Sequence, residues 1–474
     1  MDFTLPGGQV LNSVIIDFIG RPLDASISME PTLSTDVERV TIAGEIDLST
    51  SGDGSLADFR IAPIGETNFI GDRHASFFEI TPTGSIHFIT DGALVQPVGL
   101  GFFGYGVPII NDGLIDVRGQ TTTIGVLVQT QNTDFGPAIT NGGTIHVVSA
   151  SGAAEGVVSS GEFGVFNDGT IDVSGQLGSI GVTAGDPGLF QNTGSIVVHD
   201  LTAGGLGIGV QFNTTMNAHF LNAGLIQADL AISVDQSDPA GTRTADLNIY
   251  ENTGHIVGDI DLNQGNQTLL NENSIVGATD LGSGDDVYDG RHGTETGLLQ
   301  GGFGNDTLMG GAGFDNLQGN QGDDSLSGGA GDDYVVGGKD NDQQFGDDGD
   351  DIVWGNLGND TLDGGNGNGQ VRGGQGDDSL SGGLGDDFIS GDRGNDTESG
   401  GAGADIFHTF SGAGVDRVLD FNLAEGDRVM VDPGTTFSVS QVGGDTVIDM
   451  GNGDQMILVG VQMSTLTGSW IFGA

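Results

Sequence analysis

A strict nine-residue repeat between Gly301 and His408 constrains the fold of this chain more than any other feature. The stretch divides into twelve consecutive blocks without insertion, each on the pattern G-G-x-G-x-D-x-U-x, in which U is apolar. The sixth position is aspartate in eleven blocks, and Gly369 replaces it in the block 364–372. A period this regular predicts a repeat architecture in which every block forms the same small unit.

Each block is predicted to form a tight loop followed by a short strand. Glycines let the backbone take positive φ, and one apolar residue between polar neighbours has the alternation of a half-buried strand. Two blocks then form one flattened coil, so that equivalent aspartates stack along two edges at a spacing of about 4.8 Å. At that spacing two unit charges repel by about 3.5 kcal/mol at an effective dielectric constant of 20. Carboxylate and carbonyl oxygens in flexible geometry suit Ca²⁺, so the loops predict calcium sites.

The predicted calcium ligands share the sixth position of a block, except for one aspartate from an earlier loop that follows Leu281. They are Asp286, Asp306, Asp315, Asp324, Asp333, Asp342, Asp351, Asp360, Asp378, Asp387, Asp396 and Asp405. The apolar eighth position is replaced by a polar residue in two blocks, at Gln344 and Glu398.

These repeats resemble those of the RTX (repeats-in-toxin) calcium-binding proteins. The resemblance covers Gly301 to His408, about a quarter of the chain. It implies a parallel β-roll with several bound Ca²⁺ ions and export by the type I secretion machinery. It also implies that the C-terminal flank caps the roll and carries the export signal.

Composition and charge exclude several classes of partner. The chain has 66 acidic and 12 basic residues, a net charge of −54, and Lys339 is its only lysine. Binding to nucleic acid or to an anionic membrane surface needs clustered Lys or Arg, so neither partner is expected. Cysteine is absent, so disulfides and thiolate metal sites are excluded, and we expect bound calcium to supply stability instead.

We expect the protein to be secreted and to work outside the cell or at its surface. No apolar run approaches the ~18 residues that span a bilayer. Residues 1–23 lack the positive start and continuous apolar core of a signal peptide. Calcium sites of this kind would stay empty at cytosolic calcium concentrations, which favours export without an N-terminal signal.

A second and looser repeat precedes the blocks, with the core N-x-G-x-I-x-V at intervals of 25 to 30 residues. Alignment of its copies predicts a buried isoleucine column, formed by Ile86, Ile115, Ile145, Ile171, Ile196, Ile226, Ile256 and Ile275. It also predicts an asparagine column at a turn, formed by Asn111, Asn141, Asn167, Asn192, Asn222 and Asn252. Two weaker signals between the cores, a Gly-Val pair and an apolar stretch, predict three strands per coil, as in a parallel β-helix.

The sequence therefore predicts an all-β chain, in which a right-handed parallel β-helix continues into a calcium-binding parallel β-roll with a C-terminal β cap. The expected domains are an N-terminal cap with the first coils at 1–82, the β-helix at 83–280, the roll at 281–408, and the cap with the secretion signal at 409–474. Glycine pairs between alternating apolar segments predict hairpins in the last domain.

The expected function is a non-enzymatic structural or adhesive component of the cell surface or matrix, with surface polysaccharide or other matrix proteins as partners. The alternative is a β-helical polysaccharide lyase or epimerase with an RTX export tail. Such enzymes need Arg or Lys to bind uronates, yet Arg118 and Arg243 are the only basic residues besides histidine in 83–280. The motifs H-E-x-x-H and G-x-S-x-G are absent, so no catalytic residue is predicted.

One column on the outside of the β-helix alternates imidazole and carboxylate: His87, Asp116, His146 and Asp172. At strand spacing these groups could bind zinc. A solvated ladder of favourable cross-strand pairs is the preferred interpretation.

Overall fold

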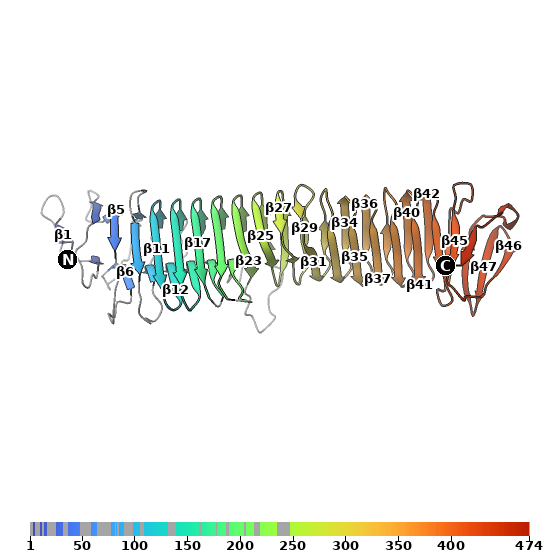
Figure 1. Ribbon diagram of the computed structural model, residues 1–474, viewed down its shortest axis with the longest axis horizontal. Helices are drawn as coiled ribbons and strands as arrows, with labels where there is room; N and C mark the ends of the chain where they lie inside the picture. The colour runs from blue at the N-terminus through green and yellow to red at the C-terminus, as the bar shows by residue number, and fades with distance from the viewer. Residues whose placement is uncertain are drawn as a thin grey trace, which may run out of the picture. The chain divides into compact units, whose positions relative to one another are not determined.

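The chain consists of β-strands, as the computed structural model in Figure 1 shows. Up to residue 104, the structure describes the nine strands β1 to β9, whose bounds are given below, and residue 82. After residue 108, it describes residues 109–473 except 131–138, 161–163, 177, 186–188, 203–204, 213–218 and 235–246. The described elements are strands apart from one 3₁₀ turn, η1 (Met463–Thr465). This confirms the predicted all-β class. No helix in the described part of the chain is long and apolar enough to cross a membrane.

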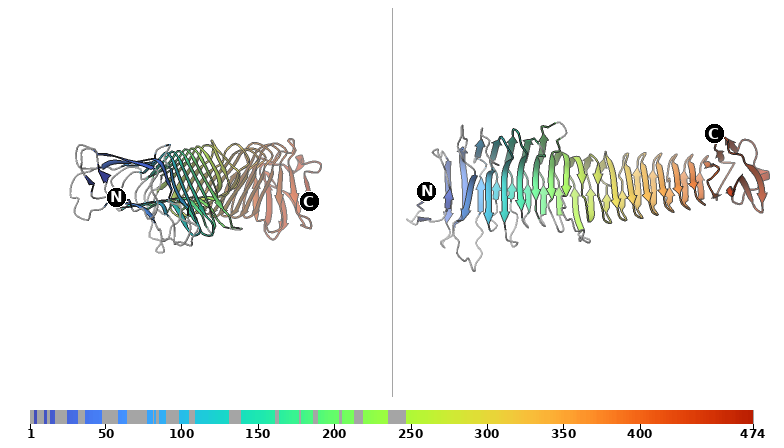
Figure 2. Two further views of the ribbon diagram at one scale, coloured as in Figure 1. Left: turned by 60° about the vertical axis from the view of Figure 1, so that its left-hand side comes forward. Right: turned by 90° about the horizontal axis from the view of Figure 1, so that it is seen from below.

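The chain divides into two compact units, residues 1–262 and residues 263–474, with residues 243–245 grouped with the second. The first unit is a parallel β-helix with three stacks of strands (Figure 2). The first stack holds β7 (Phe77–Ile80), β10 (Ile109–Asn111), β13 (Ile139–Asn141), β16 (Val165–Asn167), β19 (Leu189–Asn192), β22 (His219–Asn222) and β24 (Leu247–Asn252). The second holds β8 (Ser85–Ile89), β11 (Leu114–Gly119), β14 (Thr144–Ser149), β17 (Thr170–Gly175), β20 (Ser195–Asp200), β23 (Leu225–Val234) and β25 (His255–Asp261). The third holds β9 (Val98–Gly104), β12 (Thr123–Thr130), β15 (Ala154–Ser160), β18 (Ile180–Ala184) and β21 (Ile208–Phe212), and β23 extends into it.

The isoleucine column forms the core of this unit. Ile115 pairs in register with Ile86 and with Ile145, and the series continues coil by coil to Ile256. All seven side chains are fully buried. Ile275, the last predicted member, lies in the second unit and is also buried.

The asparagine column forms a buried ladder of side-chain amides. Asn111 Nδ2 donates to Asn141 Oδ1 over 2.7 Å, and Asn141 Nδ2 donates to Asn167 Oδ1 over 2.7 Å. The same bond links the later members through Asn252 over 2.7 to 2.8 Å. Each buried amide therefore has a partner without any charge in the column.

Antiparallel pairs precede the parallel stacks. They are β1 (Phe3–Thr4) with β2 (Val10–Leu11), β3 (Val14–Ile16) with β6 (Asp58–Pro63), and β4 (Ala25–Pro31) with β5 (Val37–Asp47). Strand β5 then pairs in parallel with both β7 and β8. Side chains before Ile80 lie outside the described residues, so the cap at 1–82 stays a prediction.

The second unit contains the β-roll, with two stacks of strands. One stack holds β26 (Asn266–Asn271), β29 (Val287–Asp289), β32 (Thr307–Met309), β34 (Ser325–Ala330), β36 (Gln343–Asp348), β38 (Thr361–Asp363), β40 (Ser379–Leu384), β42 (Thr397–Ala402) and β44 (Val415–Val418). The other holds β27 (Ser274–Val276), β28 (Thr279–Asp280), β30 (Thr294–Glu295), β31 (Leu298–Phe303), β33 (Asn316–Gln321), β35 (Tyr334–Lys339), β37 (Ile352–Leu357), β39 (Gln370–Gln375), β41 (Phe388–Arg393), β43 (Ile406–Thr409) and β45 (Arg428–Val431). Leu317, Val335 and Val353 pair in register at steps of eighteen residues, so two blocks make one coil, as predicted.

The C-terminal strands close the roll with hairpins. Strand β46 (Ser438–Val442) pairs antiparallel with β47 (Asp445–Gly451), which pairs antiparallel with β48 (Asp454–Leu458). Strand β48 lies parallel to β44, and β49 (Ile471–Gly473) lies parallel to β45. Ile448, Met456 and Leu458 are fully buried. The predicted β cap thus has a small apolar core of its own.

Chelation of calcium is expected to unfold the second unit and to leave the first folded. Buried apolar surface stabilises by roughly 25 cal/mol per Å², and the roll offers about one apolar core residue per nine-residue block. Digestion with a non-specific protease in EGTA should leave an N-terminal fragment ending between residues 262 and 280, identified by mass spectrometry. Digestion in millimolar calcium is the control. Degradation of both units at one rate in EGTA would contradict the expectation.

Candidate calcium sites

The twelve predicted aspartates lie in the loops between successive strands of the roll, and none is more than 6% exposed. The structure places them along two edges. One edge carries Asp286, Asp306, Asp324, Asp342, Asp360, Asp378 and Asp396, and the other carries Asp315, Asp333, Asp351, Asp387 and Asp405.

In eleven of the twelve aspartates, all except Asp315, one carboxylate oxygen accepts a hydrogen bond from the backbone of the preceding coil. The amide N–H of Asp306 donates to Asp324 Oδ1 over 2.8 Å, and the amide of Asp324 donates to Asp342 Oδ1 over 2.9 Å. The bond repeats along both edges. Gly369 interrupts the second edge, because it offers no carboxylate to the amide of Asp351.

The other carboxylate oxygen is buried and has no hydrogen-bond partner in eleven of the twelve aspartates. Asp315 is the exception, since its Oδ2 accepts from the amide of Gly311 over 2.7 Å. An unsatisfied buried oxygen of this kind costs about 1–3 kcal/mol, and more when it is charged. A regular series of such oxygens indicates a ligand that the protein itself does not supply.

Backbone carbonyls face the same points. A Cβ built on Gly319 would lie 2.2 Å from Asp324 Oδ2 and 2.8 Å from the carbonyl oxygen of Gly337, one coil later. On Gly355 the corresponding atoms are Asp360 Oδ2 at 2.3 Å and the Gly373 carbonyl at 2.5 Å. Only glycine fits at these positions, and the space that it leaves is lined by oxygen from two coils. Oxygen ligands of both kinds in adaptable loops fit Ca²⁺.

Burial sets the ionisation of these carboxyls. It raises the pKa of Asp306 to about 6, of Asp324 to about 7 and of Asp342 to about 8, against the hydrogen bonds from the preceding amides and with the further effect of neighbouring carboxylates. A divalent cation would favour the ionised carboxylates and give Oδ2 its partner. The residues present therefore fit the ion.

Two aspartates that the period did not reveal extend the edges. The amide of Asp396 donates to Asp416 Oδ1 over 3.4 Å, and the amide of Asp405 donates to Asp427 Oδ1 over 3.1 Å. Their spacings of 20 and 22 residues depart from the eighteen of the roll. The sequence around Gly414 keeps the G-x-D-x-U core, which was the signal available for Asp416.

A second ladder runs through the fifth position of the blocks and was also missed. The amide of Asp323 donates to Asn305 Oδ1 over 3.0 Å, and the amide of Asn341 donates to Asp323 Oδ1 over 2.9 Å. In this ladder each side chain accepts a hydrogen bond from an amide of the following coil. In the sixth-position ladder each carboxylate accepts from an amide of the preceding coil. Asn holds several of these positions, as at Asn341 and Asn359, so this ladder carries fewer charges per coil than a column of aspartates.

The structure brings the column His87, Asp116, His146 and Asp172 together on neighbouring strands. Asp116 lies 3.5 Å from His87 Nδ1 and 3.0 Å from His146 Nδ1, and Arg118 Nε donates to it over 3.0 Å. Burial raises the pKa of Asp116, but hydrogen bonds from Arg118 and His146 outweigh it and leave that pKa lowered. The Arg118 guanidinium donates to both oxygens of the Asp116 carboxylate, which a zinc ion would need as a ligand. The arrangement thus has the contacts of a ladder of cross-strand pairs.

Within the described residues, no three His, Asp or Glu side chains converge on one point as a metal site would require. The loop sites differ from such clusters, because each combines one carboxylate with backbone carbonyls.

Comparison with known proteins identifies the loops. The segments 298–317, 309–344, 336–371, 363–398 and 372–407 match the family profile described as RTX calcium-binding nonapeptide repeat (4 copies). No curated protein matches the chain. A solved structure with some similarity is the extracellular lipase LipA from Serratia marcescens, at 18% identity and a TM-score of 0.17, with 41% of each chain covered. The chain thus spans less than half of the length of that lipase.

Substitutions on the two edges should have opposite effects. Asp360→Ala is expected to damage two sites, because the carboxylate that it removes lies between those of Asp342 and Asp378 on its edge and accepts from the Asp342 amide. A site filled at 100 times its dissociation constant adds about 2.7 kcal/mol, so the unfolding free energy in calcium should fall by about 5 kcal/mol. Gly369→Asp should tighten binding on its edge, since a Cβ there has ordinary space, its nearest atom being Asp387 Oδ1 at 3.4 Å.

Calorimetric calcium titration checks both variants. Asp377→Asn is the matched control, because it removes a charge from a fifth position where asparagine also accepts the ladder bond, as at Asn341. Identical titrations for all four proteins would refute the stacked edges.

Without calcium, the roll should gain structure as the pH falls. Aspartate in an unfolded chain titrates near 3.9, whereas Asp324 and Asp333 have a pKa of about 7 in the folded roll, chiefly through burial. The folded state therefore binds more protons between about pH 4 and 7, and its stability is lost as the pH rises through the raised values. Circular dichroism in EGTA should show more strand at pH 5 than at pH 8. In calcium the roll should instead remain folded at pH 8. Equal spectra in EGTA at both pH values would contradict this.

Proposed function

Because residues 298–407 consist of RTX calcium-binding repeats, whose proteins are typically secreted, we propose that this chain is a non-enzymatic, calcium-dependent structural or adhesive component of the cell surface or matrix. The twelve predicted aspartates, together with Asp416 and Asp427, are the proposed ligand set. The proposal includes export by type I secretion, with the signal in the C-terminal cap at 409–474.

The series of buried carboxylate oxygens without a partner carries this proposal. These oxygens recur along the roll, so the fold of the whole roll, and not only a single loop, is proposed to depend on the cation. Cytosolic calcium would leave such sites empty, whereas extracellular concentrations match the affinities of this class of site. The roll is therefore proposed to fold only after export, at extracellular calcium concentrations.

One side-chain arrangement bears on the enzymatic alternative. Ser390 Oγ lies 3.0 Å from His408 Nδ1, and His408 Nε2 lies 3.0 Å from Asp432 Oδ1, a sequence of groups that nucleophilic hydrolases use. Ser390, however, has no exposed surface, and its hydroxyl also lies 2.7 Å from Asp392 Oδ1. A substrate has no access to this hydroxyl. The network therefore supports a structural contact between the last coils and the cap.

Calcium should convert the second unit from coil to strand. A glycine-rich acidic chain has much backbone entropy to lose and little apolar surface to bury, so metal binding has to supply the difference. Far-ultraviolet circular dichroism of the full chain at pH 8 should gain strand signal between EGTA and millimolar Ca²⁺. The same concentration of Mg²⁺ serves as the control and should have little effect, because magnesium demands a stricter octahedral shell. A spectrum in EGTA identical to that in calcium would refute the proposal.

A further inference from the structure

The two faces of the β-roll carry different chemistry. On the face formed by β34, β36, β38, β40 and β42, the strands contain no lysine or arginine, and serines such as Ser327, Ser381 and Ser399 recur at one position. The face formed by β33, β35, β37, β39 and β41 has aromatic, amide and basic side chains instead. Calcium binding at the edges does not explain this asymmetry.

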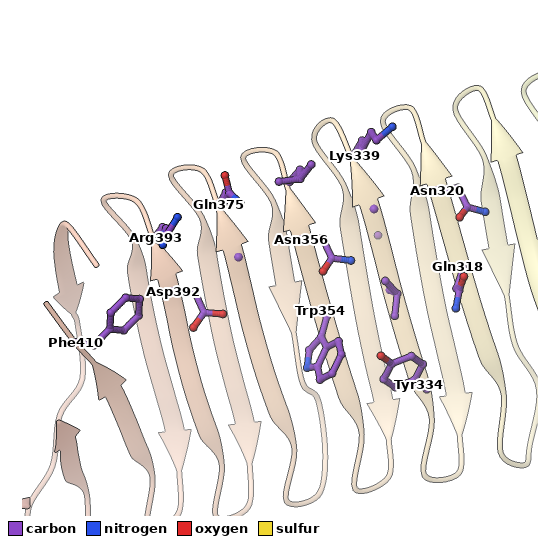
Figure 3. Close-up of a pocket in the computed structure, with 15 residues that line it drawn as sticks. Gln318, Asn320, Tyr334, Lys339, Trp354, Asn356, Gln375, Asp392, Arg393 and Phe410 are labelled. Atoms are coloured by element: carbon purple, nitrogen blue, oxygen red, sulfur yellow. The ribbon is translucent and has the colours of Figure 1, made fainter. Parts of the chain in front are cut away.

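A shallow groove of about 800 Å³ runs across the second of these faces (Figure 3). Tyr334 and Trp354 lie side by side in it, with ring centroids 5.2 Å apart at an angle of 72°, and Phe410 lies at one end. All three rings are partly exposed. Tyr and Trp present apolar faces with polar tips, which suits them to partners that are neither fully apolar nor fully polar.

A row of polar side chains borders the aromatic pair. Asn320, Asn356 and Asp392 stand on every second coil, and Gly338 and Gly374 leave open spaces between them. Each of the three occupies the second position of its block, where the repeat has glycine, and each has positive φ, at 80°, 79° and 65°. That conformation is disfavoured for residues with a Cβ relative to glycine, and less so for Asn and Asp. The opposite face has one such residue, Asp347 with φ of 70°, whereas three stand in line on this face, which points to a use for the polar groups.

Positive charge gathers at the same groove. Lys339 and Arg393 line it, and Arg372 lies on the strand next to Trp354, in register with it. These are three of the twelve basic residues of a chain with net charge −54. None of the three forms an ion pair with a carboxylate among the described residues, whereas Arg118 and Arg291 elsewhere are paired with Asp116 and Asp289. The Arg372 guanidinium lies over the Phe388 ring, 5.6 Å from its centroid, so Lys339 and Arg393 are the cations of the groove that remain for an anionic ligand.

We propose that this groove binds an anionic polysaccharide chain, an inference that rests on the proposed function as a surface or matrix component. Sugar rings stack on Tyr334 and Trp354, their hydroxyls bond to the amides of Asn320 and Asn356, and acidic groups of the sugar pair with the basic side chains. Nucleic acid, the other common polyanion, fits poorly, because its phosphates carry one charge per about 1.7 Å and would meet the acidic loops on either side.

Isothermal titration of the full chain in calcium with oligogalacturonides, short enough not to gel, tests the groove. We expect saturable binding that weakens at high salt. Trp354→Ala, and separately the pair Lys339→Gln with Arg393→Gln, should each weaken it tenfold or more. Phe345→Ala is the matched control. Phe345 holds the same position of the preceding block as Trp354 does of its own, but it lies on the opposite face. The affinity of this variant for the oligogalacturonide should equal that of the wild type.

Neutral cello-oligosaccharides form the second arm. Weak or absent binding of the neutral sugar supports the proposal, and equal affinity for both sugars overturns its anionic part. Absence of oligogalacturonide binding, or equal binding by wild type and Trp354→Ala, overturns it altogether. Circular dichroism of the same samples separates this outcome from failure of the proposed function. If the chain folds on calcium but binds no sugar, only the groove proposal is refuted. If its strand signal does not change with calcium, the proposed calcium-dependent function is refuted.

Discussion

The hydrogen bond from an aspartate amide to the carboxylate of the next coil determines how the roll is built. In Asp324, for example, it uses one carboxylate oxygen and leaves the other buried beside a glycine and a carbonyl of the neighbouring coil. The backbone thus fixes the position of the oxygens, and their charge remains to be neutralised. The arrangement that aligns the coils also concentrates the negative charge, so we expect the coils to stack only where cations bind.

In the first unit the coils stack through uncharged side chains. Its asparagine amides donate and accept within the column, so each coil satisfies its neighbour with its own side chains. Its isoleucines fill the interior in register. The roll has one apolar residue per block, and even this position holds Gln344 and Glu398 in two coils. Gln344 donates to the carbonyl of Trp354, and burial holds the pKa of Glu398 well above its usual range.

Periodicity explains which features the sequence reveals. The isoleucine column, the asparagine ladder and the eighteen-residue coil repeat one residue type at one interval, so alignment of the repeats predicts them. Asp416 and Asp427 lie where longer loops change the interval. The fifth-position ladder mixes Asn and Asp in no fixed order, so no single residue type marks it. The groove was missed for another reason. Tyr334, Trp354 and Lys339 occupy variable positions of the block, and only the fold shows that these positions share a face.

The coil of two blocks also imposes a rule of parity on how such a chain can evolve. Insertion or loss of eighteen residues adds or removes one coil, about 4.8 Å of length, and leaves every later residue on its original face. A change of nine residues would move each later strand to the opposite face and each later aspartate to the opposite edge. Depending on where it fell, it would divide Arg393 from the aromatic pair, or Trp354 from Tyr334 and Lys339. Duplications in this region can therefore preserve a surface only when the repeats are gained or lost in pairs.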